Sequence, residues 1–150
     1  RIKIPIFGNG DIDSPQKALE YRNRYGVDGI MIGRASIGYP WIFREVKHFM
    51  ATGEVLEGPT LAERLDACRT HFVKSVEWKG PKVGVFEMRR HYTNYLKGLP
   101  GIKDYRARLV TLMDPAEIEA VLDEVAVAYA GYGFERTPIE LINYHENCPL

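Results

Sequence analysis

The order of apolar segments predicts an α/β fold followed by an all-α helical bundle. Two short apolar stretches, residues 2–7 and 29–32, each precede a glycine-containing turn and flank a segment with helical character. A strand–helix–strand order of this kind is typical of a parallel sheet. Between about residues 60 and 131 the apolar residues recur at helical spacing without a strand pattern. Residues 52–59 hold two glycines, a proline and two glutamates and predict the boundary between the parts.

The first strand and helix are predicted from their ends. The strand covers about residues 2–7, where Pro5 is tolerated because it lies near the start of the strand. Ser14 is a suitable helix N-cap, and the proline that follows it fits the first helical position. Gly26 fits the position just after the end of this helix.

The second strand and helix follow the same order. The strand is expected over about residues 29–32, and a helix with apolar positions at helical spacing runs from about residue 41 to near Gly53. Trp41 and Phe43 are expected to pack under the barrel to which this sheet belongs rather than to stack on a cofactor, because buried aromatic side chains usually belong to a core.

The turns after the two strands have the composition of phosphate-binding turns. Gly8, Gly10 and Gly33 lack a Cβ, so their backbone can take positive φ and come close to a ligand. The N–H groups of such turns, backed by a helix N-terminus, suit a phosphate. Arg34 adds a permanent forked cation directly after the second strand.

Two adjacent turns of this kind predict the last two βα units of a TIM barrel, because the loops after strands 7 and 8 commonly form a phosphate site. Residues 1–53 are therefore expected to be the end of such a barrel. A whole barrel needs about 250 residues, so the chain is expected to be a fragment. The alternative is a pair of ordinary βα turns, with glycines for geometry and Arg34 solvated.

The helical part, residues 60–131, predicts a small antiparallel bundle with short connections. Thr60 and Glu63 form a capping box that opens the first helix, which stops at Gly80. Asp114, followed by proline, caps the last helix. The expected helices cover residues 60–79, 83–97, 103–112 and 114–131. The tail, residues 132–150, carries one short apolar stretch at 138–142 that reads as a strand or a helix.

The net charge is zero, but the charges are unevenly distributed. Residues 82–108 hold seven basic and two acidic side chains, whereas residues 114–146 hold eight acidic side chains and one basic. Such an asymmetry suggests one face for a polyanion and another facing solvent.

The helix over residues 83–97 carries the sharper part of this prediction. Its apolar residues can face inward, which leaves Arg89, Arg90 and Lys97 largely outward to contact phosphates, while His91 or Tyr92 approaches a sugar or base. The alternative is a solvated basic face, because charged helix faces are common.

The cysteines and the remaining histidines predict no metal site. Cys68 lies on the apolar stripe of a helix and is expected to be buried and inert. His48, His71 and His145 have no partner at metal or triad spacing and are expected to be structural or surface residues. Without a signal-peptide pattern or an apolar run of about 18 residues, a soluble cytoplasmic protein is expected.

Several separate motifs, in order, resemble bacterial tRNA-dihydrouridine synthases. They are IPIFGNGDI (4–12), GIMIGRA (29–35), PWIF (40–43), MRRHY (88–92) and YLKGLPG (95–101). The resemblance runs from residue 2 to about residue 130. It places the first three motifs in the C-terminal part of the catalytic domain and the last two in the helical domain of the family.

The resemblance implies an oxidoreductase that uses FMN and NADPH to reduce uridine to 5,6-dihydrouridine in tRNA. It implies that FMN, chiefly its phosphate end, is bound by Asn9, Gly10, Asp11, Gly33 and Arg34.

The same resemblance implies that the helical domain binds tRNA. Arg89, Arg90, His91 and Lys97 are the expected contacts.

The catalytic residue implied by the family is a cysteine in a Gly-Cys-Pro type motif in the middle of the barrel. Cys148 lies in Asn147-Cys148-Pro149, which echoes that motif but lacks the glycine and follows the helical domain. We therefore expect no catalytic residue within the chain, the acid lying upstream, and an inactive fragment.

Two other classes of function remain open on the sequence. One is another FMN-dependent TIM-barrel oxidoreductase, such as a relative of dihydroorotate dehydrogenase; the other is a stand-alone helical RNA-binding module. Because two strands of a barrel would leave exposed edges, self-association of the chain is also expected.

Overall fold

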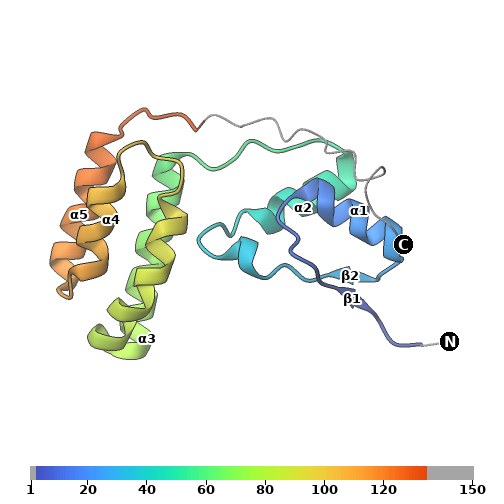
Figure 1. The fold of residues 1–150 in the computed structure, drawn as a ribbon, viewed down its shortest axis with the longest axis horizontal. Helices are drawn as coiled ribbons and strands as arrows, with labels where there is room; N and C mark the ends of the chain where they lie inside the picture. The colour runs from blue at the N-terminus through green and yellow to red at the C-terminus, as the bar shows by residue number, and fades with distance from the viewer. Residues whose placement is uncertain (1–2, 135–150) are drawn as a thin grey trace.

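The structure is a computed structural model that describes residues 3–134. An α/β lobe and a helical lobe lie next to each other along the longest axis (Figure 1). His145, Cys148 and the stretch 138–142 lie outside the described residues, as does most of the predicted tail 132–150.

Two short parallel strands form the sheet of the α/β lobe. Strand β1 (Phe7–Gly8) pairs with β2 (Gly29–Ile30), with Phe7 opposite Gly29. The parallel pairing is confirmed, but the strands are shorter than the predicted ranges 2–7 and 29–32. Each strand has only one partner here, and Pro5 has no N–H to donate.

The helix between the strands, α1 (Pro15–Tyr25), has the predicted ends. The Ser14 hydroxyl accepts a hydrogen bond from the Lys17 N–H at 3.4 Å, with proline at the start of the helix. Gly26 takes φ 59°, and its N–H donates to Arg22 O at 2.9 Å. Both caps are confirmed.

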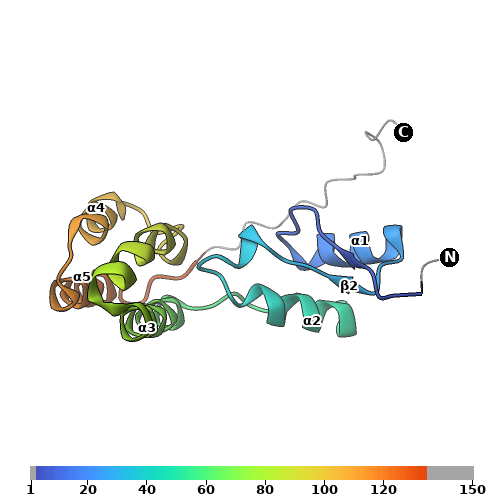
Figure 2. The same ribbon diagram turned by 90° about the horizontal axis from the view of Figure 1, so that it is seen from below.

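Helix α2 (Ile42–Thr52) follows β2 and ends at Gly53, which has φ 76°. The two helices α1 and α2 lie side by side on one face of the strand pair (Figures 1 and 2). Their small core consists of Ile12, Ala18, Ile42 and Val46.

The two aromatic residues at the start of α2 differ from the prediction. Phe43 is 45% exposed, and Trp41 packs against the core of the helical lobe rather than under the sheet. The Trp41 ring lies edge-on to Tyr39, with 5.5 Å between the centroids. The loop after β2 approaches the helical lobe at Gly38, which brings Trp41 close to that core.

The helical lobe begins with α3 (Leu61–Tyr95), which reverses direction within its span. The capping box of Thr60 and Glu63 is confirmed. Gly80 leaves the helical conformation with φ 81° and ψ 164°, and Pro81 follows it. The first and second arms of α3, residues 61–79 and 81–95, therefore pack against each other, in agreement with two predicted helices separated at Gly80.

Two shorter helices complete the lobe: α4 (Lys103–Thr111) and α5 (Pro115–Ala128). The Asp114 carboxylate accepts a hydrogen bond from Ala116 N–H at 2.9 Å, so the predicted cap is confirmed. All three helices share one core. It consists of Leu61, Leu65, Cys68, Phe72, Val85, Met88, Tyr92, Tyr95, Leu96, Leu99, Ile102, Leu109, Ile118, Val121, Leu122 and Val125.

The two lobes touch where the loop after β2 meets the end of α3. Gly38 has φ 69°, and a Cβ built on it would lie 2.5 Å from the Asn94 Cβ. The Arg64 guanidinium lies 5.6 Å from the Tyr39 ring centroid and donates to Lys97 O at 3.1 Å. Burial lowers the pKa of Arg64 from its ordinary value.

Three carboxylates of α5 pair with arginines of α3 and α4. Arg69 binds Glu119 and Asp123 at 2.5 and 2.7 Å, and Arg108 binds Glu124 at 2.7 Å. Asp123 stays 72% and Glu124 46% exposed, so the acidic face directed to solvent stays a prediction, although these carboxylates neutralise neighbouring arginines.

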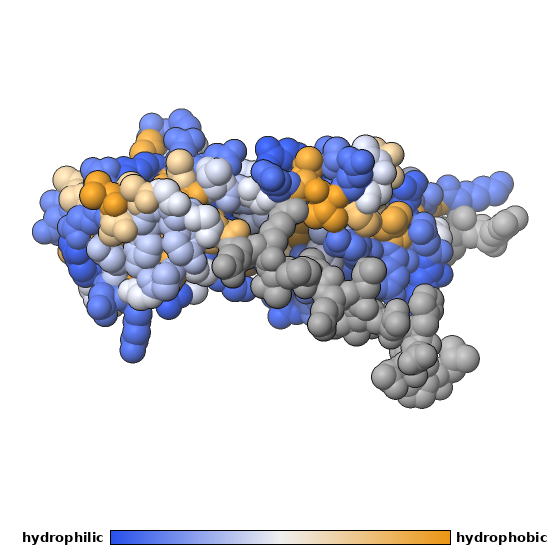
Figure 3. Space-filling view, turned by 90° about the horizontal axis from the view of Figure 1, so that it is seen from above, coloured by the Kyte–Doolittle hydropathy of each residue, from blue (hydrophilic) through white to orange (hydrophobic). Residues whose placement is uncertain are grey.

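The surface seen from above is mostly hydrophilic, with apolar patches near the middle of the molecule (Figure 3). Among residues 3–134, no helix combines the length and apolar character needed to cross a membrane.

Candidate functional site

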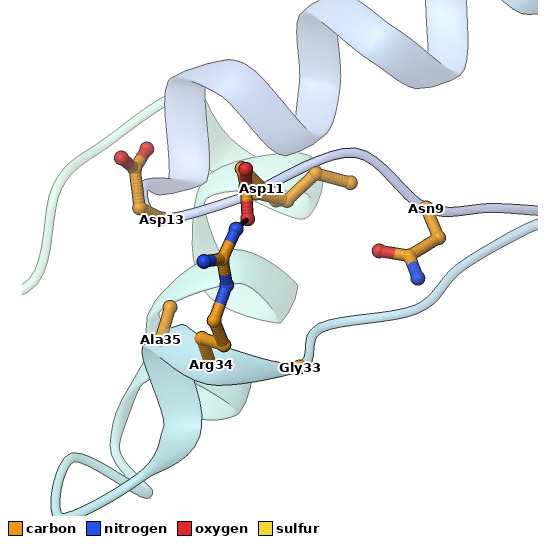
Figure 4. Close-up of a pocket in the computed structure, with 7 residues that line it drawn as sticks. Asn9, Asp11, Asp13, Gly33, Arg34 and Ala35 are labelled. Atoms are coloured by element: carbon orange, nitrogen blue, oxygen red, sulfur yellow. Dashed lines mark hydrogen bonds and ion pairs between the residues drawn. The ribbon is translucent and has the colours of Figure 1, made fainter.

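A cavity of about 670 Å³ lies beyond the C-terminal ends of the two strands, where parallel strands place their following turns (Figure 4). It is lined by Asn9, Asp11, Ile12, Asp13, Gly33, Arg34 and Ala35. Four of the five residues expected to bind a cofactor therefore line one cavity, and the fifth, Gly10, lies between two lining residues.

Parallel pairing brings the two turns together. Met31 N–H donates to Gly8 O at 2.8 Å, and Gly29 N–H donates to Ile6 O at 3.2 Å, so both strands end at the same level. The short helical turn η1 (Arg34–Ser36) starts four residues after the end of β2, and its Ser36 N–H donates to Gly33 O at 3.0 Å. The first N–H groups of such a turn have no partner inside it.

The backbone conformation of the two turns differs from the prediction. The described residues with positive φ do not include Gly8, Gly10 or Gly33; Gly33 has φ −100°. Asp11 takes the left-handed conformation instead, with φ 49°. A short polar side chain tolerates this region better than most residues.

The two glycines that border the cavity region differ in the space around them. A Cβ on Gly10 would lie 3.0 Å from the Tyr21 ring, so a side chain there would displace the ring. A Cβ on Gly33 would meet no heavy atom within 4 Å, so this backbone borders open space. A ligand can therefore approach the Gly33 backbone closely.

Arg34 faces the first turn across the cavity (Figure 4) and forms an ion pair with Asp11. The pair uses one terminal nitrogen, and a guanidinium has five N–H donors, so the others remain for an anion. Lys17 donates to Asp11 O at 2.7 Å and lies 3.7 Å from the Asp13 carboxylate. The charges of the Asp11 and Asp13 carboxylates are therefore balanced by those of Arg34 and Lys17.

The four residues expected to contact RNA do not lie in one place. Arg90 Nε donates to His91 Nε2 at 3.1 Å, so these two act together on the second arm of α3. Arg89 points to the other side, where it contacts Met113 Sδ at 3.1 Å and lies over the Phe86 ring. Lys97 is exposed beyond the end of the helix.

Tyr92 is fully buried, so the expectation that it approaches a sugar or base is wrong. Burial raises the pKa of Tyr92, as it raises the pKa of Cys68 to about 12. The burial expected at Cys68 is confirmed, and the raised pKa is in line with an inert thiol. Within residues 3–134, no three histidine, cysteine or acidic side chains are grouped as metal ligands.

His71 and His91 form a pair that the sequence did not reveal. Their rings lie 4.5 Å apart between centroids, and His71 Nδ1 lies 3.3 Å from the Tyr95 hydroxyl. Burial lowers the pKa of His71, as does the charge of Arg90; burial and then His71 lower the pKa of His91. The two histidines are 20 positions apart in the sequence. The only sequence signal for their contact is the reversal of the chain at Gly80, which brings the two arms of α3 together.

Fold and site together define a class: a parallel βα unit with a polar cavity at the strand ends, joined to a helical lobe. A sequence model described as dihydrouridine synthase (Dus) matches residues 1–130. The chain therefore belongs to the dihydrouridine synthase family.

Curated relatives support the assignment. The tRNA-dihydrouridine synthase B of Pseudomonas aeruginosa is 42% identical over 113 residues, which is 75% of this chain and 34% of the relative. The protein of that name from Xanthomonas axonopodis pv. citri is 47% identical over 71% of this chain and 32% of its own length. A probable tRNA-dihydrouridine synthase of Rickettsia conorii is 36% identical over 82% of this chain and 37% of its own length. The chain thus spans about a third of these relatives.

Proposed function

We propose that the chain is part of a tRNA-dihydrouridine synthase that uses FMN and NADPH to reduce uridine in tRNA. In this proposal residues 1–53 supply the last two βα units of a TIM barrel and anchor the FMN phosphate. Residues 60–131 form the tRNA-binding domain. The catalytic acid and the rest of the barrel lie outside the 150 residues, so the chain by itself is inactive.

The observation that carries the proposal is the cavity between the turns after β1 and β2. The open backbone at Gly33, the partly engaged Arg34 guanidinium and the next residue of η1, Ala35, line the same space. Phosphate sites of TIM barrels commonly occupy this position, after strands 7 and 8 and next to a short extra helix. The donor set fits a phosphate.

Each residue has a defined part in this binding. Arg34 donates to phosphate oxygens while the Asp11 carboxylate holds one edge of its guanidinium. Gly33 leaves room for the phosphate, and Asn9 presents an exposed amide at the rim. FMN, when bound, supplies the hydride for C6 of the uracil ring. The family's cysteine, outside this chain, would provide the proton for C5.

The phosphate anchor is tested by an NMR titration of the ¹⁵N-labelled chain with FMN. We expect the amide resonances of Gly10, Gly33 and Arg34 to shift with FMN. Riboflavin, which lacks the phosphate, should leave them unchanged. Arg34→Gln should weaken binding roughly tenfold, because a hydrogen bond to a charged group is worth about 1.5–3 kcal/mol. Equal shifts with riboflavin would refute the phosphate site.

Binding of tRNA by the helical lobe is tested across a salt series. We expect the affinity of the chain for tRNA to fall steeply as the salt concentration rises. Arg90→Gln should lower the affinity, and it should reduce the slope of log affinity against log salt concentration by about 1, the value for one phosphate contact. Lys47→Gln removes an exposed cation from α2 in the other lobe and is the matched control. A folded chain that binds no tRNA would argue against this role.

The strand pair also bears on self-association of the isolated chain. Phe7, in β1, is 69% exposed, and Ile4, three residues before it, is 72% exposed. Strand β1 has only one neighbouring strand among the described residues. Exposed apolar strand edges tend to pair with other chains. We propose that the isolated chain associates through this edge and that Ile4→Lys together with Ile6→Lys shifts it toward monomer in sedimentation velocity. Equal sedimentation of both proteins would contradict this.

A further inference from the structure

A second cavity, of about 360 Å³, lies between the two arms of α3. It is separate from the cavity at the strand ends and shares none of its residues. Its lining residues are His71, Lys74, Ser75, Trp78, Lys79, Glu87, Arg90 and His91.

The charge of this cavity favours an anion. Three cations face one carboxylate, and that carboxylate, on Glu87, is paired with Lys79. Lys74 binds Glu77 at 2.8 Å. Arg90 forms no ion pair within residues 3–134.

The hydrogen bond between Arg90 and His91 orients the guanidinium. Arginine is only a donor, so His91 Nε2 accepts, and the neutral ring carries its proton on Nδ1. Because Arg90 uses Nε in this bond, its two terminal nitrogens keep four N–H donors. Such a fork matches two oxygens of a phosphate.

The aromatic side chain at the cavity has no packing role in the fold. Trp78 is 84% exposed, although large apolar side chains are normally buried. The Lys79 ammonium lies 5.4 Å from the indole centroid, so a cation borders the aromatic surface. A flat aromatic surface next to phosphate donors is the arrangement by which proteins hold unpaired nucleotides.

We propose that this cavity binds one unpaired nucleotide of an RNA strand, with Arg90 on the phosphate and the Trp78 indole stacked on the base. The inference rests on the proposed function in that RNA is the partner. A duplex is disfavoured, because its bases are already stacked inside the helix. A phosphorylated peptide would use the cations but has no need of the exposed indole.

The test measures tryptophan fluorescence and affinity with the full 150-residue chain and a single-stranded uridine hexanucleotide. We expect the hexanucleotide to quench the emission of the wild type but not that of Trp78→Leu, whose remaining signal comes from Trp41. Affinity should fall about tenfold in Trp78→Leu and recover in part in Trp78→Phe, because stacking of a base tolerates any aromatic ring.

Two controls make the outcome specific. Arg90→Gln should also lose about tenfold, whereas Lys47→Gln should bind nearly as the wild type. Circular dichroism should be unchanged in Trp78→Leu, since the side chain is exposed. An RNA duplex and a phosphoserine peptide should bind more weakly than the hexanucleotide.

The two proposals fail in different ways. If Arg90→Gln weakens tRNA binding but Trp78→Leu binds as the wild type, the nucleotide pocket is wrong and the RNA-binding role stands. Tighter binding of the phosphoserine peptide would also overturn the pocket. If the folded wild type binds neither tRNA nor the hexanucleotide, both proposals are wrong.

Discussion

Arg34 and Arg90 show how neighbours decide what a cation can bind. Asp11 holds one edge of Arg34, and His91 accepts a hydrogen bond from Arg90; each guanidinium keeps unused donors. Arg89, directly before Arg90, is half-buried against Met113 and Phe86. The sequence shows that these three residues are arginines. Which of them can contact a ligand depends on neighbouring side chains from other segments, which the sequence does not reveal.

The histidine pair predicts a pH dependence of stability. Both rings have a lowered pKa in the folded state, so the unfolded chain binds more protons as the pH falls below about 6.5. Stability should therefore be full above that pH and should be lost as the pH falls toward the lowered values. We expect the midpoint of thermal unfolding to decrease from pH 7 to pH 5, and to decrease less in His71→Gln.

Other charged groups face the histidines from both arms of α3. They are Lys74, Lys79, Glu87 and Arg90. Lys74→Gln serves as a control, because lysine does not titrate in this range. An identical loss of stability with pH in His71→Gln and in the wild type would rule out the pair as the cause.

Helix ends could be predicted from the sequence because capping is local chemistry. Ser14, Thr60 and Asp114 each bond to a backbone N–H two or three residues away, so short motifs suffice. The packing of the two arms of α3 could not be predicted in the same way. This packing depends on contacts between residues that are far apart in the sequence, and a periodic pattern of apolar residues does not encode such contacts.

At Gly84 the backbones of the two arms lie close together. A Cβ there would lie 2.5 Å from Ser75 O and 2.7 Å from Val76 Cα. We expect Gly84→Ala to lower the free energy of unfolding in urea by about 1–3 kcal/mol, because the clash is with backbone. Gly133→Ala, with no heavy atom within 4 Å of its Cβ position, should change it by less than about 0.5 kcal/mol. Equal stability of the two variants would contradict this packing.

At the scale of the whole molecule, the two hydrophobic cores are separate and meet through few contacts. The predicted boundary at residues 52–59 stays a prediction, which the two cores support. The parallel order of the strands could be predicted because a helix separates them. Their short length could not, because strand extent depends on neighbouring strands that a local pattern does not contain.

The contact between the lobes can be tested at Gly38. Alanine there meets both the strain of positive φ and the Asn94 Cβ, whereas alanine at Gly26 meets only the strain. We expect Gly26→Ala to cost about 1–2 kcal/mol of unfolding free energy and Gly38→Ala to cost more. Gly38→Ala should also speed proteolysis within residues 53–59. If the two variants are cleaved at the same rate, the lobes are not held by this contact.

The Gly38 contact also has a consequence for substrate choice. The loop that carries Gly38 begins at η1, beside the proposed phosphate anchor, and abuts the end of α3, whose arms hold the proposed nucleotide pocket. The Gly38 contact then limits how far apart the two proposed sites can move. If both proposals hold, the uridine that reaches the FMN would lie at a limited distance from the nucleotide bound in the second cavity, whatever the sequence between them.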